Sequence, residues 1–178
     1  MAKKTALYDE HVRLGGKIVE FAGWLLPVNY ENGILYEHAA VRTRAGLFDV
    51  SHMGEIIFEG KNATEVLQKL VTNSVADIYE GQCRYALMLY PDGGIVDDLI
   101  IYKFNSEKYL LVINAANTDK DYEWIKEHTI KGIAKNVSEH ISQIALQGPL
   151  SEKIISKVTD IDKLPKKRYN FVKDVTVA

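Results

Sequence analysis

A turn between two extended runs is the feature that most constrains what this chain can fold into. Pro91-Asp92-Gly93-Gly94 offers glycines for positive φ angles and separates residues 85–90 from residues 95–102. The second run reads Ile95-Val96-Asp97-Asp98-Leu99-Ile100-Ile101-Tyr102 and is rich in β-branched residues, which favour strands. The pattern predicts a β-hairpin.

Two adjacent aspartates interrupt the second strand of this hairpin. Successive side chains of a strand point to opposite faces, so Asp97 should share a face with Leu99, and Asp98 should share the other face with Tyr102. A carboxylate that faces an apolar core costs free energy unless something binds it. If one face is covered, only one aspartate reaches solvent easily, and the other is either a satisfied structural residue or a working group.

The hairpin lies within a regular succession of elements between residues 53 and 138. Apolar spacing predicts further strands at 55–59, 108–113 and 133–137, with helices over 63–70 and between 117 and 132. The order β-α-β-β-β-α-β is typical of an α+β fold in which a mostly antiparallel sheet is flanked by helices. We expect residues 53–138 to form one domain, inserted in a second.

The second domain is predicted from residues 1–52 and 139–178, and it is discontinuous and β-rich. It includes short strands at 17–20 and 143–146 and a last alternating run, 171–177, where the sequence stops. An end in mid-strand is typical of a truncated chain, so we expect this domain to be incomplete. Such a sheet would leave an unpaired edge and an apolar surface, from which we expect self-association.

Composition excludes several classes of function. A net charge of −2 gives no electrostatic footprint for nucleic acid. The single cysteine, Cys83, excludes an internal disulfide and a multi-cysteine metal site within one chain. No stretch approaches the roughly 20 apolar residues of a membrane span, and no apolar segment follows the basic N-terminus as in a secretory signal. We expect a cytoplasmic protein without nucleic-acid or membrane partners.

The histidines form no catalytic or metal-binding motif, and we expect no metal. They are scattered, and no two of them have HxH or HxxxH spacing. Asp49, Ser51 and His52 are too close together in sequence to form a Ser-His-Asp relay, and no GxSxG turn accompanies them. We interpret this stretch as a structural turn. A phosphate-binding GxxxxGK[ST] loop is also absent from the sequence.

What remains is an acid on a sheet face with aromatic and amide neighbours, namely Tyr85, Asp98, Tyr102 and Asn114. An acid and an amide can hydrogen-bond a flat, nitrogen-rich heterocycle while tyrosines cover its face. The alternative is that Asp98 merely pairs with Arg84 or Lys103 at the sheet surface. The spacing alone leaves both interpretations open.

Several motifs, taken together and in order, resemble one known family. They are Phe21-Ala22-Gly23-Trp24, the run from Gly46 to Glu55 (GLFDVSHMGE), the run from Gly93 to Tyr102 (GGIVDDLIIY), Asn114-Ala115-Ala116-Asn117 and Gln147-Gly148-Pro149. This order closely resembles the T protein of the glycine cleavage system, a tetrahydrofolate-dependent aminomethyltransferase. The resemblance runs from about Leu7 to the last residue.

The resemblance implies a fold, a reaction and partners. Family members are three-domain proteins that hold folate in a central cavity. They take the aminomethyl group carried on the lipoyl arm of the H protein, pass its methylene to tetrahydrofolate as acceptor substrate, and release ammonia. The lipoylated H protein and folate are therefore the expected partners of this chain.

The resemblance also assigns residues. Asp98 matches the family's key acid and is the expected catalytic residue, near the N10 side of folate, where it would position or deprotonate the attacking amine. Met53, Tyr85, Tyr102 and Asn114 match positions around the pterin and its linker, and Tyr169 is a further expected folate contact. Asp97 is then the structural member of the pair.

The chain departs from the family in length. Complete members are about twice as long, so we expect a truncated form in which part of the folate cavity is missing and activity is weak or absent. An alternative function is a folate-binding module without transferase activity, as in relatives that serve in iron–sulfur assembly or as folate domains of demethylases. The retained Asp98 and DVSHMGE stretch favour the aminomethyltransferase.

Overall fold

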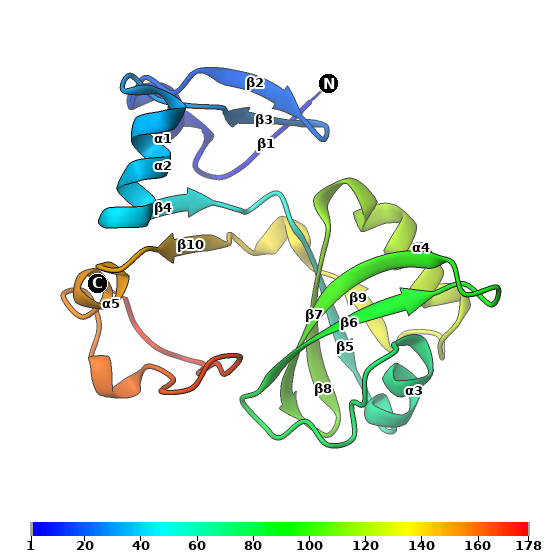
Figure 1. Ribbon diagram of the computed structural model, residues 1–178. Coiled ribbons are helices and arrows are strands. Elements are labelled where there is room, and N and C mark those ends of the chain that lie inside the picture. Colours follow the sequence, from blue (N-terminus) through cyan, green and yellow to red (C-terminus); the bar gives the residue numbers. More distant parts are fainter. Residues whose placement is uncertain (1, 178) are drawn as a thin grey trace. The chain divides into compact units, whose positions relative to one another are not determined.

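The computed structural model describes residues 2–177, and its contacts divide the chain into two compact units. Unit 1 comprises the described residues of segments 1–52, 142–161 and 176–178, and unit 2 comprises segments 53–141 and 162–175. Figure 1 shows the elements of both units coloured along the sequence.

Unit 2 is built on a five-stranded sheet in the order β6-β7-β8-β5-β9, and every neighbouring pair is antiparallel. Two helices complete the order β-α-β-β-β-α-β, which confirms the predicted α+β fold class. The elements are β5 (Gly54–Glu59), α3 (Ala63–Leu70), β6 (Cys83–Leu89), β7 (Ile95–Asn105), β8 (Lys108–Ile113), the 3₁₀ turn η1 (Ala115–Asn117), α4 (Thr118–Glu127), β9 (Ala134–Asn136) and the 3₁₀ turn η2 (Ser138–His140).

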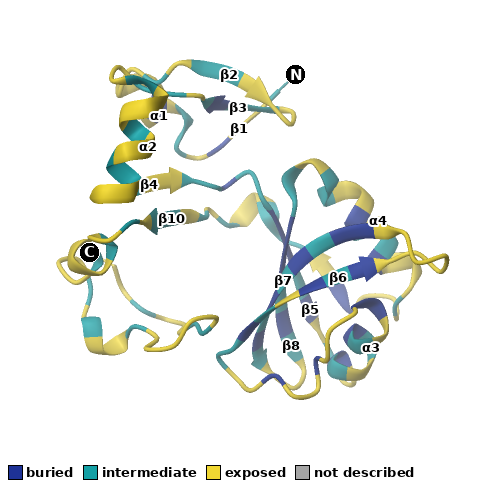
Figure 2. Cartoon of the chain, in the orientation of Figure 1, coloured by how far each residue is buried: buried dark blue, intermediate teal, exposed yellow. Residues whose placement is uncertain are grey.

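Both helices pack on the same face of this sheet and cover its apolar side chains. Ile56, Ile101 and Leu111 come from three neighbouring strands and are completely buried. They belong to one cluster with Leu67 of α3 and Ile125 of α4, which are also completely buried. In Figure 2 this unit contains most of the dark blue ribbon. Burial of this one face is what fixes the strand register, because a slip by one residue would turn every apolar side chain outward.

Unit 1 consists of small elements with little core. A three-stranded sheet, a two-stranded sheet and three helices make it up: β1 (Lys3–Lys4), α1 (Tyr8–Arg13), β2 (Ile18–Phe21), β3 (Trp24–Pro27), α2 (Gly33–Thr43), β4 (Gly46–Asp49), β10 (Ile144–Gln147) and α5 (Ser151–Ile155), followed by the 3₁₀ turn η3 (Ile161–Lys163) at the unit boundary. Among its described residues, Leu26 is the one buried hydrophobic side chain. Within residues 2–177, no helix has the length and hydropathy needed to cross a membrane.

The prediction of a last strand at 171–177 is wrong. Tyr169 and Asp174 adopt positive φ angles of 54° and 57°, which interrupt an extended backbone. The chain instead joins unit 2, where the N–H of Cys83 donates to the carbonyl of Tyr169 and the N–H of Phe171 donates to the carbonyl of Gly81. The unpaired edge expected from that strand is therefore absent.

These contacts also move a boundary between the two parts of the chain. Residues 139–178 were predicted to belong together with residues 1–52, but the contacts place segment 162–175 in unit 2. The reason is local packing, since the ring of Phe171 meets those of Tyr102 and Phe104 edge-on at centroid distances of 5.4 and 5.0 Å. The alternation of apolar residues in 171–177 did not indicate that this segment packs against β7.

Candidate functional site

The two adjacent aspartates of β7 lie on opposite faces of the unit 2 sheet. Asp97 pairs with Met88 of β6 and is 6% exposed on the helix-covered face. Asp98 pairs with Leu87 and is half-buried on the other face, which neither α3 nor α4 covers. We call this second surface the open face. Strand alternation predicted that the two aspartates lie on opposite faces, and the structure shows that Asp98 is the one that points away from the helices.

Asn114 connects the two aspartates. It follows the last residue of β8, and its Nδ2 lies 3.0 Å from Asp97 Oδ1 and 3.0 Å from Asp98 Oδ1, with the carbonyl of Asp98 at 3.3 Å. An amide NH₂ group has two hydrogens, so it can donate to both carboxylates at once. The side chain of Asp98 is therefore held in one orientation by the residue that follows the neighbouring strand.

The strand register defines which other side chains share the open face. Tyr85, Ile100, Val112 and Glu55 lie directly opposite one another on four successive strands, so they form one row. On β7 this row is flanked by Asp98 on one side and Tyr102 on the other. Asp98 and Tyr102 are four positions apart on the strand, which is about 13 Å.

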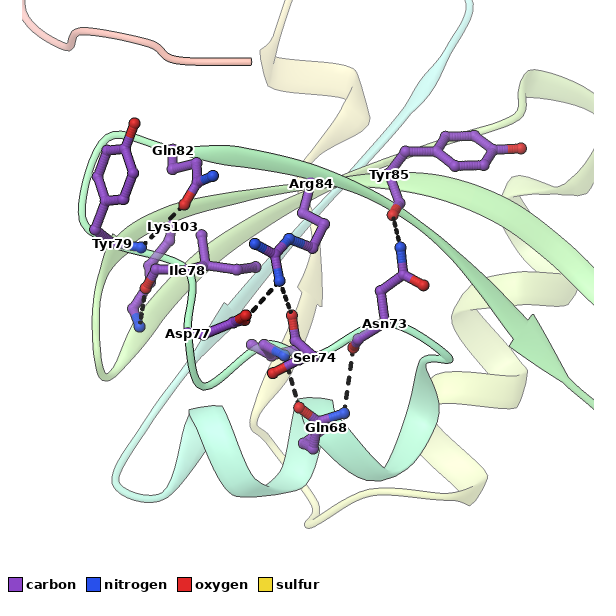
Figure 3. Close-up of polar contacts among 11 residues, drawn as sticks. Gln68, Asn73, Ser74, Asp77, Ile78, Tyr79, Gln82, Arg84, Tyr85 and Lys103 are labelled. Carbon is purple, nitrogen blue, oxygen red and sulfur yellow. Dashed lines mark hydrogen bonds and ion pairs between the residues drawn. The ribbon is translucent and has the colours of Figure 1, made fainter. Parts of the chain in front are cut away.

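Arg84 and Lys103 do not pair with Asp98, so that alternative is wrong. Figure 3 shows the Arg84 guanidinium directed at Asp77 and at the carbonyl of Ser74, which lies 2.8 Å from Nη1. Lys103 is buried, and its ammonium donates to the carbonyl of Ile78 at 2.6 Å. Both cations hold the loop after α3 against the sheet, and their hydrogen bonds go to this loop and not to Asp98.

The two tyrosines of the open face differ in their surroundings. Tyr85 is 48% exposed, and in Figure 3 its ring stands clear of the loop contacts while its carbonyl accepts a hydrogen bond from Asn73 at 2.7 Å. Desolvation and the negative charge of Asp98 raise the pKa of the Tyr85 phenol. Tyr102 is half-buried, and burial is the main cause of its raised pKa. Both phenols therefore stay protonated at neutral pH and can donate hydrogen bonds.

Met53 and Tyr169 lie at opposite ends of this surface. Gly54 and Leu99 both pair with Ile113, from the two sides of β8. The next position on each of the three chain segments is Met53, Asn114 and Asp98, so these three residues lie side by side at this end of the sheet. Tyr169 is bonded through its carbonyl to Cys83, which pairs with Tyr102. Its side chain is 64% exposed. The predicted residues thus extend from Met53 to Tyr169 along the sheet of unit 2.

Sequence reasoning missed two buried acids of unit 2. Glu55 is on the open face, is 1% exposed, and neither of its carboxyl oxygens has a hydrogen-bond partner among the described residues. Burial raises its pKa to about 7. Asp121 of α4 is completely buried on the helix-covered face. A glutamate between Gly54 and Ile56 was a signal for the first, but Asp121 lies in an ordinary amphipathic helix that gave none.

Unit 1 has a cavity of its own, of about 640 Å³, and none of the predicted site residues lines it. Its acid, Asp49, accepts hydrogen bonds from Thr5 at 2.6 Å, from His11 at 2.8 Å and from the N–H of Ser51 at 3.0 Å. The Asp49-to-His52 stretch is thus a hydrogen-bonded turn. Within residues 2–177, no cluster of three or more His, Cys, Asp or Glu side chains is placed to hold a metal ion.

The fold and these motifs together define one family of α+β domains, and comparison with known proteins identifies it. Residues 7–178 match the family described as the GCVT N-terminal domain, and the chain belongs to that family. This confirms the resemblance found in the sequence motifs.

Curated relatives and a solved structure agree with this assignment. The chain is 52% identical over 174 residues to an aminomethyltransferase of Natranaerobius thermophilus, covering 97% of this chain and 47% of that protein. It is 50% identical to an aminomethyltransferase of Alkaliphilus oremlandii, covering 98% and 48%. The crystal structure of glycine cleavage system aminomethyltransferase T from Bartonella henselae superimposes with a TM-score of 0.80 at 34% identity, covering 88% of this chain and 44% of that one. The chain therefore spans about half the length of the relatives it matches.

Proposed function

We propose that this chain is the N-terminal half of a tetrahydrofolate-dependent aminomethyltransferase of the glycine cleavage system. In this proposal folate lies on the open face of unit 2, with its reacting nitrogens near Asp98. The observation that carries the proposal is the carboxylate of Asp98, which is half-buried, turned away from the core, and held by the Asn114 amide at 3.0 Å.

The geometry suits an acceptor for the N–H of an attacking amine. Asn114 occupies Oδ1 of Asp98, so Oδ2 is the oxygen that would receive the hydrogen bond or the proton of tetrahydrofolate. The methylene of the aminomethyl group on the H-protein lipoyl arm would form new bonds to two nitrogens of tetrahydrofolate while its C–N and C–S bonds break, so that ammonia and the free lipoyl thiol would leave. A carboxylate placed in this way typically contributes about 10²–10⁴-fold to the rate.

The neighbouring side chains would bind the flat parts of folate. Tyr85 and Tyr102 present rings and phenol donors on the same face as Asp98, and Met53 offers a polarizable contact at the end of β5. Tyr169 would reach the far end of the ligand. The part of the relatives that this chain does not span would complete the cavity, and the lipoylated H protein would be the partner of the complete enzyme in the cytoplasm.

A folate-binding module without transferase activity is the second candidate. The observation that favours it is that all six predicted residues lie in unit 2, so a ligand could bind this unit without the rest of a transferase. Such a module would bind folate and would show no transfer from aminomethyl-lipoyl H protein even when the remaining half is supplied.

Calorimetric titration with a stable tetrahydrofolate analogue tests the proposal. We expect saturable binding that Asp98→Asn weakens about 10-fold or more, because charge-assisted hydrogen bonds are worth about 1.5–3 kcal/mol. Asp92→Asn is the matched control, since it removes an exposed carboxylate from the turn of the same hairpin. Binding that is identical in wild type and Asp98→Asn would exclude Asp98 from the site, and no heat from a folded chain would overturn folate binding by this half.

A further inference from the structure

Behind Asp98, on the helix-covered face, lies a second pair of carboxyl groups. Asp97 of β7 is 6% exposed and Asp121 of α4 is completely buried. The mechanism proposed above uses neither of them. Two ionised carboxylates in contact at such a position would repel each other strongly, so the arrangement needs a compensating proton or cation.

Both acids keep one oxygen without an ordinary partner. Among the described residues, neither Asp97 Oδ2 nor Asp121 Oδ2 receives a hydrogen bond from an N–H or hydroxyl group. Each carboxyl group lies close enough to influence the pKa of the other, and two carboxyl groups can hydrogen-bond only if one of them carries a proton. The remaining oxygen of Asp121 accepts a hydrogen bond from the Lys120 ammonium at 2.7 Å.

The pair is linked to the open face through one side chain. Asn114 donates to Asp97 Oδ1 and to Asp98 Oδ1, each at 3.0 Å, so its amide is shared between a buried acid and the acid of the proposed site. The continuous sequence of contacts is Lys120, Asp121, Asp97, Asn114 and Asp98.

We propose that Asp97 and Asp121 share one proton, and that this pair is a positioning element for Asp98 that acts through the Asn114 amide. The inference rests on the proposed function for the role of Asp98. With the proton in place, the pair carries one negative charge and Asn114 divides its donors between Asp97 and Asp98. When the proton leaves to solvent, Asp97 faces a second negative charge, attracts the amide more strongly, and the hold on Asp98 loosens.

The electrostatic surroundings place this change near neutral pH. Burial, followed by the hydrogen bond to Asp97, raises the pKa of Asp121 to about 7, and Lys120 opposes the rise. Burial would raise the pKa of Asp97, but hydrogen bonds from Asp121, Asn114 and Asn117 outweigh it and lower that pKa.

The charged, titratable and amide groups near the pair, on either face of the sheet, come from four elements. Lys120 is on α4 beside Asp121, and Asp98 follows Asp97 on β7. Tyr85 of β6 is near enough for both aspartates to raise its pKa. Asn114 and Asn117, at the two ends of the turn after β8, contribute neutral amides. Lys120 is the one cation in this set.

Carboxyl ¹³C NMR of aspartate-labelled chain tests the pair without any ligand. We expect the Asp121 signal to titrate near pH 7 and the Asp98 signal to move in the same pH interval. In Asp121→Asn, whose amide can still donate to Asp97, the movement of the Asp98 signal near pH 7 should disappear. Asp119→Asn, which removes an exposed acid from the same helix, should leave it unchanged. An Asp121 signal that titrates near pH 4, or an Asp98 signal that ignores the step, would overturn the inference.

Binding of the tetrahydrofolate analogue gives a second readout. Glu55 also titrates near pH 7 on the open face, so the measurement uses Glu55→Gln as the background. In this background the affinity should fall about twofold or more from pH 6 to pH 8, the lower end of couplings within one hydrogen-bonded network. Asp121→Asn should keep its pH 6 affinity at pH 8, a result that a purely structural role for Asp121 would not give. An affinity that falls equally in Asp121→Asn would contradict the inference. If the chain binds no folate, the proposed function fails, while the NMR titration still decides whether the pair exists.

Discussion

At the scale of single residues, strand alternation alone predicts that the two neighbouring aspartates lie on opposite faces of the sheet, whereas their expected roles come from the family resemblance. Asp97 and Asp98 differ by one position, and that position decides between a buried face and an open one. Asp121 could not be found in this way. Its contact with Asp97 joins residues 24 positions apart on different elements, and only the packing of α4 on the sheet brings them together.

Glu55 is a residue at which stability should depend on pH. Its pKa rises from an ordinary value of 4.5 to about 7 on folding, so the folded chain keeps a proton that the unfolded chain loses. The free energy of unfolding should therefore fall as pH rises from about 4.5 to about 7. At about 1.4 kcal/mol per pKa unit, the loss is at most about 3 kcal/mol.

Substitution of Glu55 isolates this contribution. Compared with wild type, Glu55→Gln should be about 1–3 kcal/mol more stable at pH 8 and nearly unchanged at pH 5, because the neutral amide replaces a group that is neutral only at the lower pH. Hydrogen exchange of the β5 and β8 amides measures the difference. Glu65→Gln, at an exposed acid of α3, is the control. An equal effect at both pH values would exclude titration of Glu55 as the cause.

At the scale of elements, the sequence was informative where burial is one-sided. Apolar spacing predicted every strand and both helices of the unit 2 sheet, because α3 and α4 cover one face only and the alternation is clear. The run 171–177 alternates in the same way and forms no strand. Its conformation depends on contacts between Phe171 and the rings of Tyr102 and Phe104, which are distant in sequence.

Phe171 is expected to hold segment 162–175 against β7. Phe171→Ala would remove two edge-on ring contacts, each worth about 0.5–1.5 kcal/mol, together with part of the buried apolar area. The amides of Cys83 and Phe171, which bond across this junction, should then exchange about 10-fold faster or more. Val172→Ala, at a side chain that is 45% exposed, should have little effect. Unchanged exchange in Phe171→Ala would show that the backbone hydrogen bonds alone hold the segment.

At the scale of the whole chain, the two units differ in how many of their hydrophobic side chains are buried, and this difference bears on self-association. Unit 2 holds nearly all of the buried hydrophobic side chains, whereas α2 of unit 1 buries none of its residues. Leu35 is 86% exposed, Leu47 66% and Phe21 62%. The edge strand from which we expected self-association is absent, but unit 1 exposes several large apolar side chains.

Self-association is therefore still expected, now through unit 1. Light scattering should show a mass that rises with concentration, and Leu35→Glu should lower that mass toward the monomer value. Ile130→Glu replaces a comparably exposed apolar residue in unit 2, at 57% exposure, and should not change the mass. A monomer at every concentration would contradict this prediction.

Side chains on opposite faces of a β-sheet normally do not contact each other, because each side chain points to one face and the backbone lies between the faces. Asn114 lies one position beyond the end of β8, where there is no further ladder to separate the faces, and its amide touches a carboxylate on each. At the end of a strand, one side chain can therefore contact groups on both faces of the sheet. If the proposed coupling holds, a change in helix α4 would reach Asp98 on the open face without displacing a strand.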